Sequence, residues 1–439
     1  MSAAQHYVEH YRALASALPG EHLPWLRRLR EEAQSRFSAS GFPSPREEEW
    51  KYTNVAPIEK KLFSPAAGSP AGVADTSALA RPRLADAWSL VFIDGIYAAE
   101  HSVTAGLPEG VIATSLAEAL EQHPDRIEAL LNRVVPEEAH GFIAFTTAYF
   151  RDGAFVYVPA GMILDRPLQV IHFSTRPDGL AVTRNVIAVE QNAEASIVET
   201  YAGAEDLSYL TAAVTEISVG ENAGLNHYKL QSETDKGYHF GGIYAKQARS
   251  ARFRQYHLAF GGLMARTEIH AHLGHAAECE LSGLFLGTGR RHLDTQTLIH
   301  HHAPFGISRE TYRGIAGDRA RGVFSGRIVV HPDAQKTDAE MSNRNLLLSE
   351  DAEIDSKPQL EIHADDVKCA HGVTVGQLDS EAVFYLESRG VDEPTARNML
   401  TFAFANEMVE KIRLNSLKSL VQSELLSFLP QSDIRKDWL

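Results

Sequence analysis

Cysteine is scarce in this chain: Cys279 and Cys369 are the only two in 439 residues. Two thiols cannot build the disulfide framework of a small secreted protein, so we expect a reducing compartment. Positive charge is also scarce, because 42 Lys and Arg stand against 57 Asp and Glu and leave a net charge of −15. This balance argues against nucleic acid, whose phosphates need clustered cations, and equally against an anionic membrane surface.

Long apolar runs are missing as well. No stretch of the sequence approaches the roughly 20 apolar residues that a bilayer crossing needs. The first residues, MSAAQHYVEHYRALAS, are amphipathic and carry Glu9, whereas a signal peptide has an uninterrupted apolar segment. We therefore expect a cytoplasmic protein without a membrane partner.

Motifs for nucleotide and acyl chemistry are absent too. The sequence has no GxxxxGK followed by Ser or Thr, no GxGxxG between a strand and a helix, and no GxSxG. The stretch GTGRR (287–291) is basic and Gly-rich, but its position between two expected strands indicates a turn. The sequence therefore gives no sign of an ATPase or a serine hydrolase.

Composition and the spacing of apolar residues divide the sequence into three parts. Residues 1–135 are mostly helical, with amphipathic spacing in YVEHYRALASAL and LPWLRRLREEAQSRF, and contain a Pro- and Gly-rich linker near 64–77. From 136 to 379, short apolar or alternating runs follow one another with Gly, Asn and Asp between them, which predicts strands. Residues 380–439 have helical spacing again.

A weak internal repeat indicates how the strands are arranged. The segments QNAEASI, ENAGLNH, KQARSARF, GHAAECEL, GDRARGVF and SEDAEIDS share a polar pair, a small residue and then a strand. Because no helix interrupts this long run of strands, we expect a parallel β-helix, with a large β-sandwich as the alternative. The predicted fold class is mainly β, a solenoid flanked by N-terminal and C-terminal α-helical regions.

Residues 392–412 predict a helix with a wide apolar surface. Asp392 is the expected N-cap, and Pro394 lies in the first turn. The apolar positions are Met399, Leu400, Phe402, Phe404, Met408, Val409 and Ile412. Such a surface either covers the β-helix or docks a partner protein, and the pattern does not separate these two interpretations.

The strand VKCAHGVTVG places a thiol two residues before an imidazole. Side chains alternate along a strand, so Cys369 and His371 point to the same side with Cα atoms roughly 7 Å apart. They could be packed core residues, a nucleophile with its base, or half of a metal site. A structural zinc or an iron–sulfur cluster takes four ligands, so the others would come from elsewhere in the chain or from another chain.

A second group of histidines lies upstream. EIHAHLGHAAECE contains His270, His272 and His275, which is a plausible catalytic zinc arrangement. LIHHHAPFG adds three consecutive histidines, of which only His300 and His302 can share one face of a strand. Histidine-rich strand surfaces are more often solvated than metal-bound. A metal-dependent (zinc) β-helix enzyme is therefore only the alternative function.

One long block carries a family resemblance. The segment from HHAPFGISRETYRGIAGDRARGVFSGRIVVHPDAQKTDAEMSNRNLLLS through DAEIDSKPQLEIHADDVKCAHGVTVGQLD strongly resembles the SufB/SufD family of iron–sulfur cluster assembly proteins. GFPSPREEEWKYTN and GAFVYVPAGMILDRPLQV match the same family, so the resemblance spans nearly the whole chain. The helical N-terminal region and the few cysteines are more similar to the SufD branch than to the SufB branch.

The resemblance implies a right-handed parallel β-helix and a non-enzymatic scaffold role. It implies assembly with a SufB-like paralogue and a SufC-like ATPase, and a homodimer when the chain is isolated. An iron–sulfur cluster would be held transiently, shared with the partner subunit, and passed to apoprotein acceptors. No tightly bound cofactor is expected in the isolated chain, and ATP hydrolysis would belong to the SufC-like partner.

The resemblance also assigns roles to residues. It implies that His371 contributes its imidazole at the interface where the cluster is built, opposite a cysteine of the SufB-like partner. Cys369 matches the neighbouring thiol of the family motif. The family commonly has KCSHG where this chain has KCAHG, but Ala370 projects to the opposite face of the strand. The helices around 392–428 would dock the SufC-like ATPase.

Overall fold

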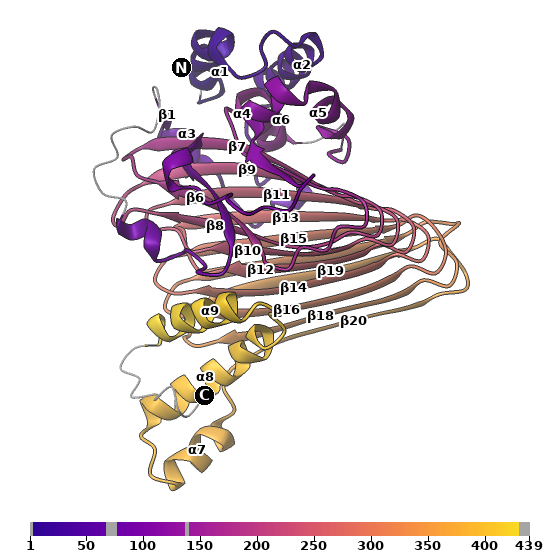
Figure 1. The fold of residues 1–439 in the computed structure, drawn as a ribbon. Helices are drawn as coiled ribbons and strands as arrows, with labels where there is room; N and C mark the ends of the chain where they lie inside the picture. The colour runs from indigo at the N-terminus through magenta and orange to yellow at the C-terminus, as the bar shows by residue number, and fades with distance from the viewer. Residues whose placement is uncertain (1–2, 67–76, 137–139, 430–439) are drawn as a thin grey trace.

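The computed structural model describes residues 3–66, 77–136 and 140–429 (Figure 1). Its main body is a parallel β-helix in which successive strands from β5 to β20 alternate between two sheets. The mainly β solenoid with helices at both ends, expected from the sequence, is confirmed. Most of the predicted linker near 64–77 lies outside the described residues.

The two sheets contain ten strands each. The first sheet consists of β4 (Ile112–Ser115), β5 (Ala154–Val158), β7 (Gly179–Val189), β9 (Tyr209–Val219), β11 (Tyr238–Gln247), β13 (Met264–Leu273), β15 (His292–His301), β17 (Arg321–Val330) and β19 (Glu353–Ile362), with β1 (Ser64–Pro65) beside β7. The second sheet consists of β2 (Trp88–Ile93), β3 (Ile96–Tyr97), β6 (Leu168–Ser174), β8 (Glu194–Gly203), β10 (Gly224–Gln231), β12 (Arg252–Ala259), β14 (Glu278–Gly287), β16 (Ile307–Ala316), β18 (Asp338–Leu347) and β20 (Lys368–Gly376).

Helices lie at both ends of the solenoid (Figure 1). The N-terminal α-helices are α1 (Ala3–Leu14), α2 (Pro24–Ser40), α3 (Ala56–Lys60), α4 (Leu116–Gln122), α5 (Pro124–Leu130) and α6 (Gly141–Tyr149). The C-terminal ones are α7 (Ser380–Ser388), α8 (Glu393–Val409) and α9 (Asn415–Ser427). Short 3₁₀ turns occur at Ala15–Ala17, Glu48–Trp50, Ser77–Ala80 and Ala99–His101. None of the described helices combines the length and apolarity needed to cross a membrane.

The weak sequence repeat corresponds to one recurring turn. In each of several coils a residue adopts a left-handed conformation, as Asn192 and Asn222 do with φ of 57°. Asparagine tolerates this conformation better than most residues do. An alanine follows directly and is completely buried. This arrangement occurs at 192–193, 222–223, 250–251 and 276–277. The turn keeps successive coils in register, and the small alanine lets them stack closely.

The N-terminal end of the solenoid is covered by apolar helices. Every residue of α6 is buried, which is why its sequence, GFIAFTTAY, is apolar on all sides. Aromatic rings join α6 to α2 and the segment after it: Phe42 lies 4.6 Å from Phe142 and 5.3 Å from Phe145, between ring centroids. Phe142 in turn stacks on Phe240 of β11 at 4.5 Å. One continuous cluster therefore attaches the N-terminal helices to the first sheet.

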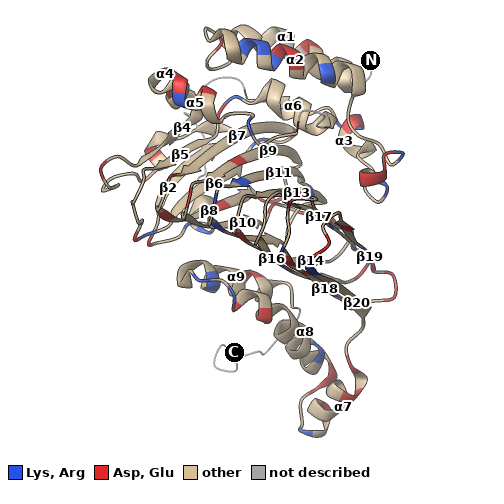
Figure 2. Cartoon of the chain, turned by 90° about the vertical axis from the view of Figure 1, so that its right-hand side faces the viewer, with Lys and Arg blue, Asp and Glu red and all other residues tan. Residues whose placement is uncertain are grey.

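The apolar surface predicted over 392–412 packs against the solenoid. Asp392 caps α8 by accepting a hydrogen bond from the Thr395 backbone N–H at 3.1 Å. Phe402, Val409 and other apolar side chains of α8 and α9 are buried on the outer face of the second sheet. Figure 2 shows α8 and α9 along this face, with α7 projecting beyond β20. This surface therefore covers the solenoid, and the docking role expected for residues 392–428 stays a prediction.

Close packing inside the coils yields a first prediction. A Cβ added to Gly283 of β14 would lie 2.0 Å from Cε1 of Tyr312, which is 1% exposed and cannot move aside. We expect Gly283→Ala to lower the free energy of unfolding by about 1–3 kcal/mol, measured through the thermal unfolding midpoint. Gly376→Ala is the control, because an added Cβ there meets nothing within 4 Å. Equal midpoints for the two variants would contradict this packing.

Candidate functional site

The C-terminal end of the solenoid is open. Among the described strands, β19 pairs only with β17 and β20 only with β18, so the last coil has two unpaired edges. Ile362 and Val375 continue inward-facing columns of the sheets, yet they are 43% and 46% exposed. Unpaired strand edges beside exposed apolar side chains are features of a surface that another chain covers.

Cys369 and His371 lie on the inner face of this last coil. In the ladder Cys369 follows Ala339, and His371 follows Met341. Both Ala339 and Met341 belong to the buried core between the sheets. The predicted alternation is therefore confirmed: the thiol and the imidazole project to the same side of β20. Cys369 is half-buried and packs against the core, whereas His371 is exposed.

The Cys369 thiol is protonated at neutral pH. Partial burial, together with the negative charge of Asp338, raises the pKa of Cys369 above its ordinary value. A protonated thiol is a poor nucleophile and a poor ligand, but a metal ion that binds the sulfur displaces the proton. This environment does not fit a nucleophile with its base, and it is compatible with a ligand that forms only when metal arrives.

The other cysteine occupies the same column of the second sheet. Cys279, Ser308, Ala339 and Cys369 are successive partners in the ladder. With about 4.8 Å between neighbouring strands, the two cysteines lie roughly 14 Å apart along the axis. Cys279 is buried among apolar side chains, which raises its pKa. It is a core residue and not a second ligand for the open end.

The zinc arrangement expected from His270, His272 and His275 does not form. His270 packs its ring against Tyr244 at 4.8 Å, and His275 packs against Phe305 at 5.6 Å. Their neighbour His272 instead places Nδ1 2.9 Å from Nε2 of His302 on the next coil. The expectation was wrong because it used spacing along one strand, whereas contacts between coils decide which histidines meet.

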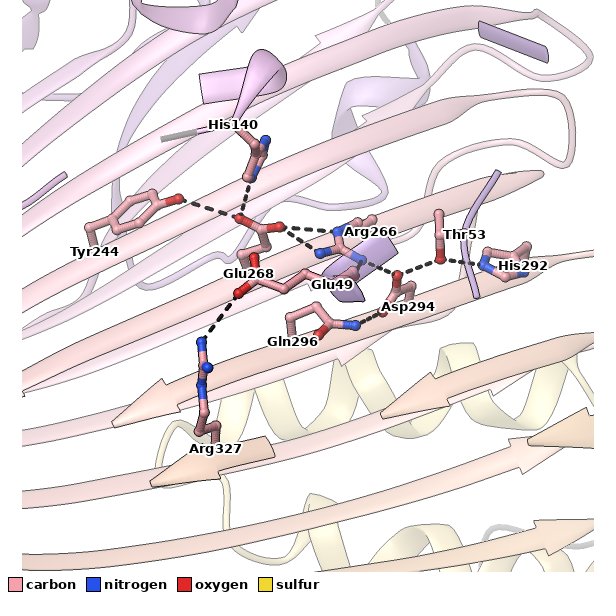
Figure 3. Close-up of polar contacts among 10 residues, drawn as sticks. All are labelled: Glu49, Thr53, His140, Tyr244, Arg266, Glu268, His292, Asp294, Gln296 and Arg327. Atoms are coloured by element: carbon pink, nitrogen blue, oxygen red, sulfur yellow. Dashed lines mark hydrogen bonds and ion pairs between the residues drawn. The ribbon is translucent and has the colours of Figure 1, made fainter. Parts of the chain in front are cut away.

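A buried charged network attaches the N-terminal segment to the first sheet (Figure 3). Its centre is Arg266, which donates to Glu268 at 2.8 Å and to Asp294 at 2.6 Å. Arg266 also donates to the Glu49 backbone carbonyl at 2.9 Å, and its guanidinium lies 3.7 Å from the ring centre of Trp50. The EEWKYTN motif therefore binds this arginine directly, which sequence reasoning did not predict.

The acids of this network are fully engaged. Glu268 also accepts from Tyr244, and it pairs with His140 at 2.8 Å. Burial raises the pKa of Glu268, but the charges of His140 and Arg266 outweigh burial and hold it below its usual range. Asp294 also accepts from Thr53 at 2.5 Å. Because each carboxylate is paired, the network is a structural attachment and not a reactive centre.

Polar side chains also line the inside of the coils formed by β8 to β11. Glu199 accepts hydrogen bonds from Tyr201 and Thr215 and pairs with His227 at 3.1 Å. Glu233 pairs with His239 at 2.9 Å. All these groups are almost completely buried, and each carboxylate is paired with a histidine within the solenoid. They lie several coils from the open end.

The comparisons with known proteins match this architecture. Residues 172–404 match the family described as SUF system FeS cluster assembly, SufBD core domain. Residues 1–170 match the SufBD protein N-terminal region. The chain therefore belongs to the SufB/SufD family of the SUF iron–sulfur cluster assembly system.

Relatives within this family place the chain on its SufD side. It is 33% identical over 400 residues to the iron–sulfur cluster assembly protein SufD of Escherichia coli, covering 89% of this chain and 90% of that protein. An iron–sulfur cluster assembly SufBD family protein of Synechocystis is 31% identical over 400 residues, covering 89% and 88%. The SufD protein of Bacillus subtilis is 26% identical over 328 residues, covering 72% and 73%.

Glu310 gives a prediction of pH-dependent stability. It accepts one hydrogen bond from Thr297, its other oxygen has no hydrogen-bond partner, and burial raises its pKa to about 8. Between its ordinary pKa and about 8 the folded chain keeps a proton that the unfolded chain loses, so stability falls as pH rises. In Glu310→Gln this loss disappears, which raises stability at pH 9 by up to about 5 kcal/mol and changes it little at pH 5.

The measurement is the thermal unfolding midpoint of both proteins across this pH range. Glu350→Gln serves as the control, because Glu350 is exposed on the surface. Parallel curves for wild type and Glu310→Gln would show that Glu310 does not retain its proton in the folded chain.

Proposed function

We propose that this chain is a scaffold subunit of a SUF complex that takes part in building nascent iron–sulfur clusters. The observation that carries the proposal is the open last coil, where Cys369 and His371 share one face beside unpaired strand edges. Membership of the SufB/SufD family supports it. The finished cluster passes to apoprotein acceptors, and the complex works in the cytoplasm.

The two side chains form half of a site. A cluster takes four ligands, so the remaining ones come from a SufB-like paralogue whose β-helix meets this one at β19 and β20. Such pairing also satisfies the unpaired backbone groups of the last coil. The cluster is cargo shared between the two subunits, and the isolated chain forms a homodimer through the same edges.

ATP hydrolysis belongs to a SufC-like partner in this proposal. The C-terminal region docks it, and α7 is the element that supplies the contact, because α8 and α9 bury their apolar faces on the solenoid. Phe384 and Tyr385 of α7 are 70% and 57% exposed. Exposed aromatic side chains on a projecting helix suit a protein interface.

The first test measures iron and acid-labile sulfide in the complex purified anaerobically with SufB-like and SufC-like partners. We expect His371→Ala to assemble normally but to bind iron about tenfold more weakly or worse, since one ligand is lost. Cys369→Ser reports whether the thiol is a second ligand. His363→Ala is the matched control, because it removes another exposed histidine from the same end of the solenoid.

Equal iron and sulfide in wild type and His371→Ala would place the ligands entirely on the partner. The role of the open coil would then be interface packing alone.

A second test concerns α7. Phe384→Glu places a charge at the proposed interface, and we expect it to weaken binding of the SufC-like ATPase by about 2 kcal/mol or more. Binding of the SufB-like subunit should be unchanged. Glu387→Gln alters an exposed charge on the same helix and serves as the control. Unchanged ATPase binding in Phe384→Glu would move the docking surface away from α7.

A further inference from the structure

Four histidines from three successive coils gather at the carboxyl ends of β13, β15 and β17 in the first sheet. The ladder register places His272 of β13 beside His300 of β15, and their rings stack at 4.9 Å with 3° between the planes. His302 and His331 follow the ends of β15 and β17, with their ring centres 4.5 Å apart. His301, between His300 and His302, points inward and bonds to Ser308.

The ring nitrogens of this histidine cluster converge. A ring nitrogen from each of three histidines, His300, His302 and His331, lies within 4.8 Å of the other two. Among the described residues, this is the group of three His, Cys, Asp or Glu side chains that lies close enough together to hold a metal ion. His272 Nδ1 lies 2.9 Å from His302 Nε2, and His300 Nδ1 lies 3.2 Å from His331 Nε2. The fourth ring, His272, therefore contacts one member of this group through a nitrogen.

We propose that the histidine cluster binds one divalent first-row transition-metal ion, with zinc as the model ion. His300, His302 and His331 provide three ligands, and His272 or water completes the tetrahedron. Zn–N bonds of 2.0–2.1 Å place ligand nitrogens roughly 3.4 Å apart, so the rings need to approach by about 1 Å. Side-chain rotation achieves this, because His302 is exposed and His300 and His331 are only half-buried.

The chemistry of the cluster selects the class of metal. All its ligands are imidazoles, which suit zinc, cobalt, nickel and iron, whereas calcium and magnesium require oxygen ligands. The ion would replace two hydrogen bonds between imidazoles, which use the same nitrogens. Lys246 opposes binding, because it neighbours His272 in the ladder and its ammonium repels a cation.

The cluster borders an open groove that an ion can enter from solvent. Val134, Val135 and Lys246 line this groove together with His272, His300 and His302. The cluster lies on the outside of the solenoid, whereas Cys369 and His371 face the inside of the last coil. This inference therefore does not depend on the proposed role of the open end, and each can fail without the other.

The experiment titrates chelator-stripped, tag-free protein with zinc by calorimetry and with cobalt by visible absorption. We expect one ion per chain with a dissociation constant in the micromolar range or below, and the intense visible bands of tetrahedral cobalt. His302→Ala and His331→Ala should each weaken binding at least about tenfold. Lys246→Ala should tighten it, since it removes the opposing charge.

Two controls make the result specific. His275→Ala removes a half-buried histidine that follows the end of β13 but packs against Phe305. This variant should bind zinc like wild type. His371→Ala should also bind normally. Absence of saturable binding, or equal binding by wild type and His302→Ala, would overturn the proposal. Loss of binding in His371→Ala alone would locate the ion at the open end and overturn it as well.

Discussion

The in-register parallel ladder is the constraint on which the rest of this structure depends. Because each strand pairs residue for residue with the strands one coil away, a side chain's place in its strand fixes its column through the whole solenoid. The same rule leads from Cys279 to Cys369 inside the solenoid and brings His272 beside His300 outside it. It also requires the last coil to end in unpaired edges, so the fold itself creates the surface that another chain can extend.

The terminal strands of the solenoid are covered at one end and left unpaired at the other. At the N-terminal end, α6 is buried on all sides. Farther along the solenoid, the Arg266 network attaches residues 49–53 to β13 and β15. Removing one partner of such a buried charged group leaves another charge unpaired, so the network holds this segment on the sheet. At the C-terminal end, α8 and α9 cover an outer face and leave the last coil open. The N-terminal end is therefore covered, and the C-terminal end leaves a surface available for assembly.

Local patterns in the sequence predicted what depends on one strand or one turn. Alternation placed Cys369 and His371 on one face, and the polar pair before a small residue marked the recurring turn. What the sequence could not predict are contacts between coils. Spacing grouped His272 with His270 and His275, but the register brings it to His302, thirty residues away. Thr53 and Asp294 are separated by an even longer stretch of sequence, although they form a hydrogen bond, and no periodicity in the chain connects these two residues.

If Cys369 belongs to the half-site that we propose, the state of its thiol explains why such a site remains inert until it is assembled. Partial burial and the charge of Asp338 favour the neutral thiol, so the sulfur does not react readily in the isolated chain. In the proposed assembly, metal arriving with ligands from a second chain would supply the positive charge that releases the proton, and closure of the interface would remove competing water. Ligand formation, metal binding and pairing of β19 and β20 would then favour one another, because each would lower the free-energy cost of the next. An isolated strand bearing the same two side chains would lack this coupling, since its thiol would be neither buried nor opposed by a partner.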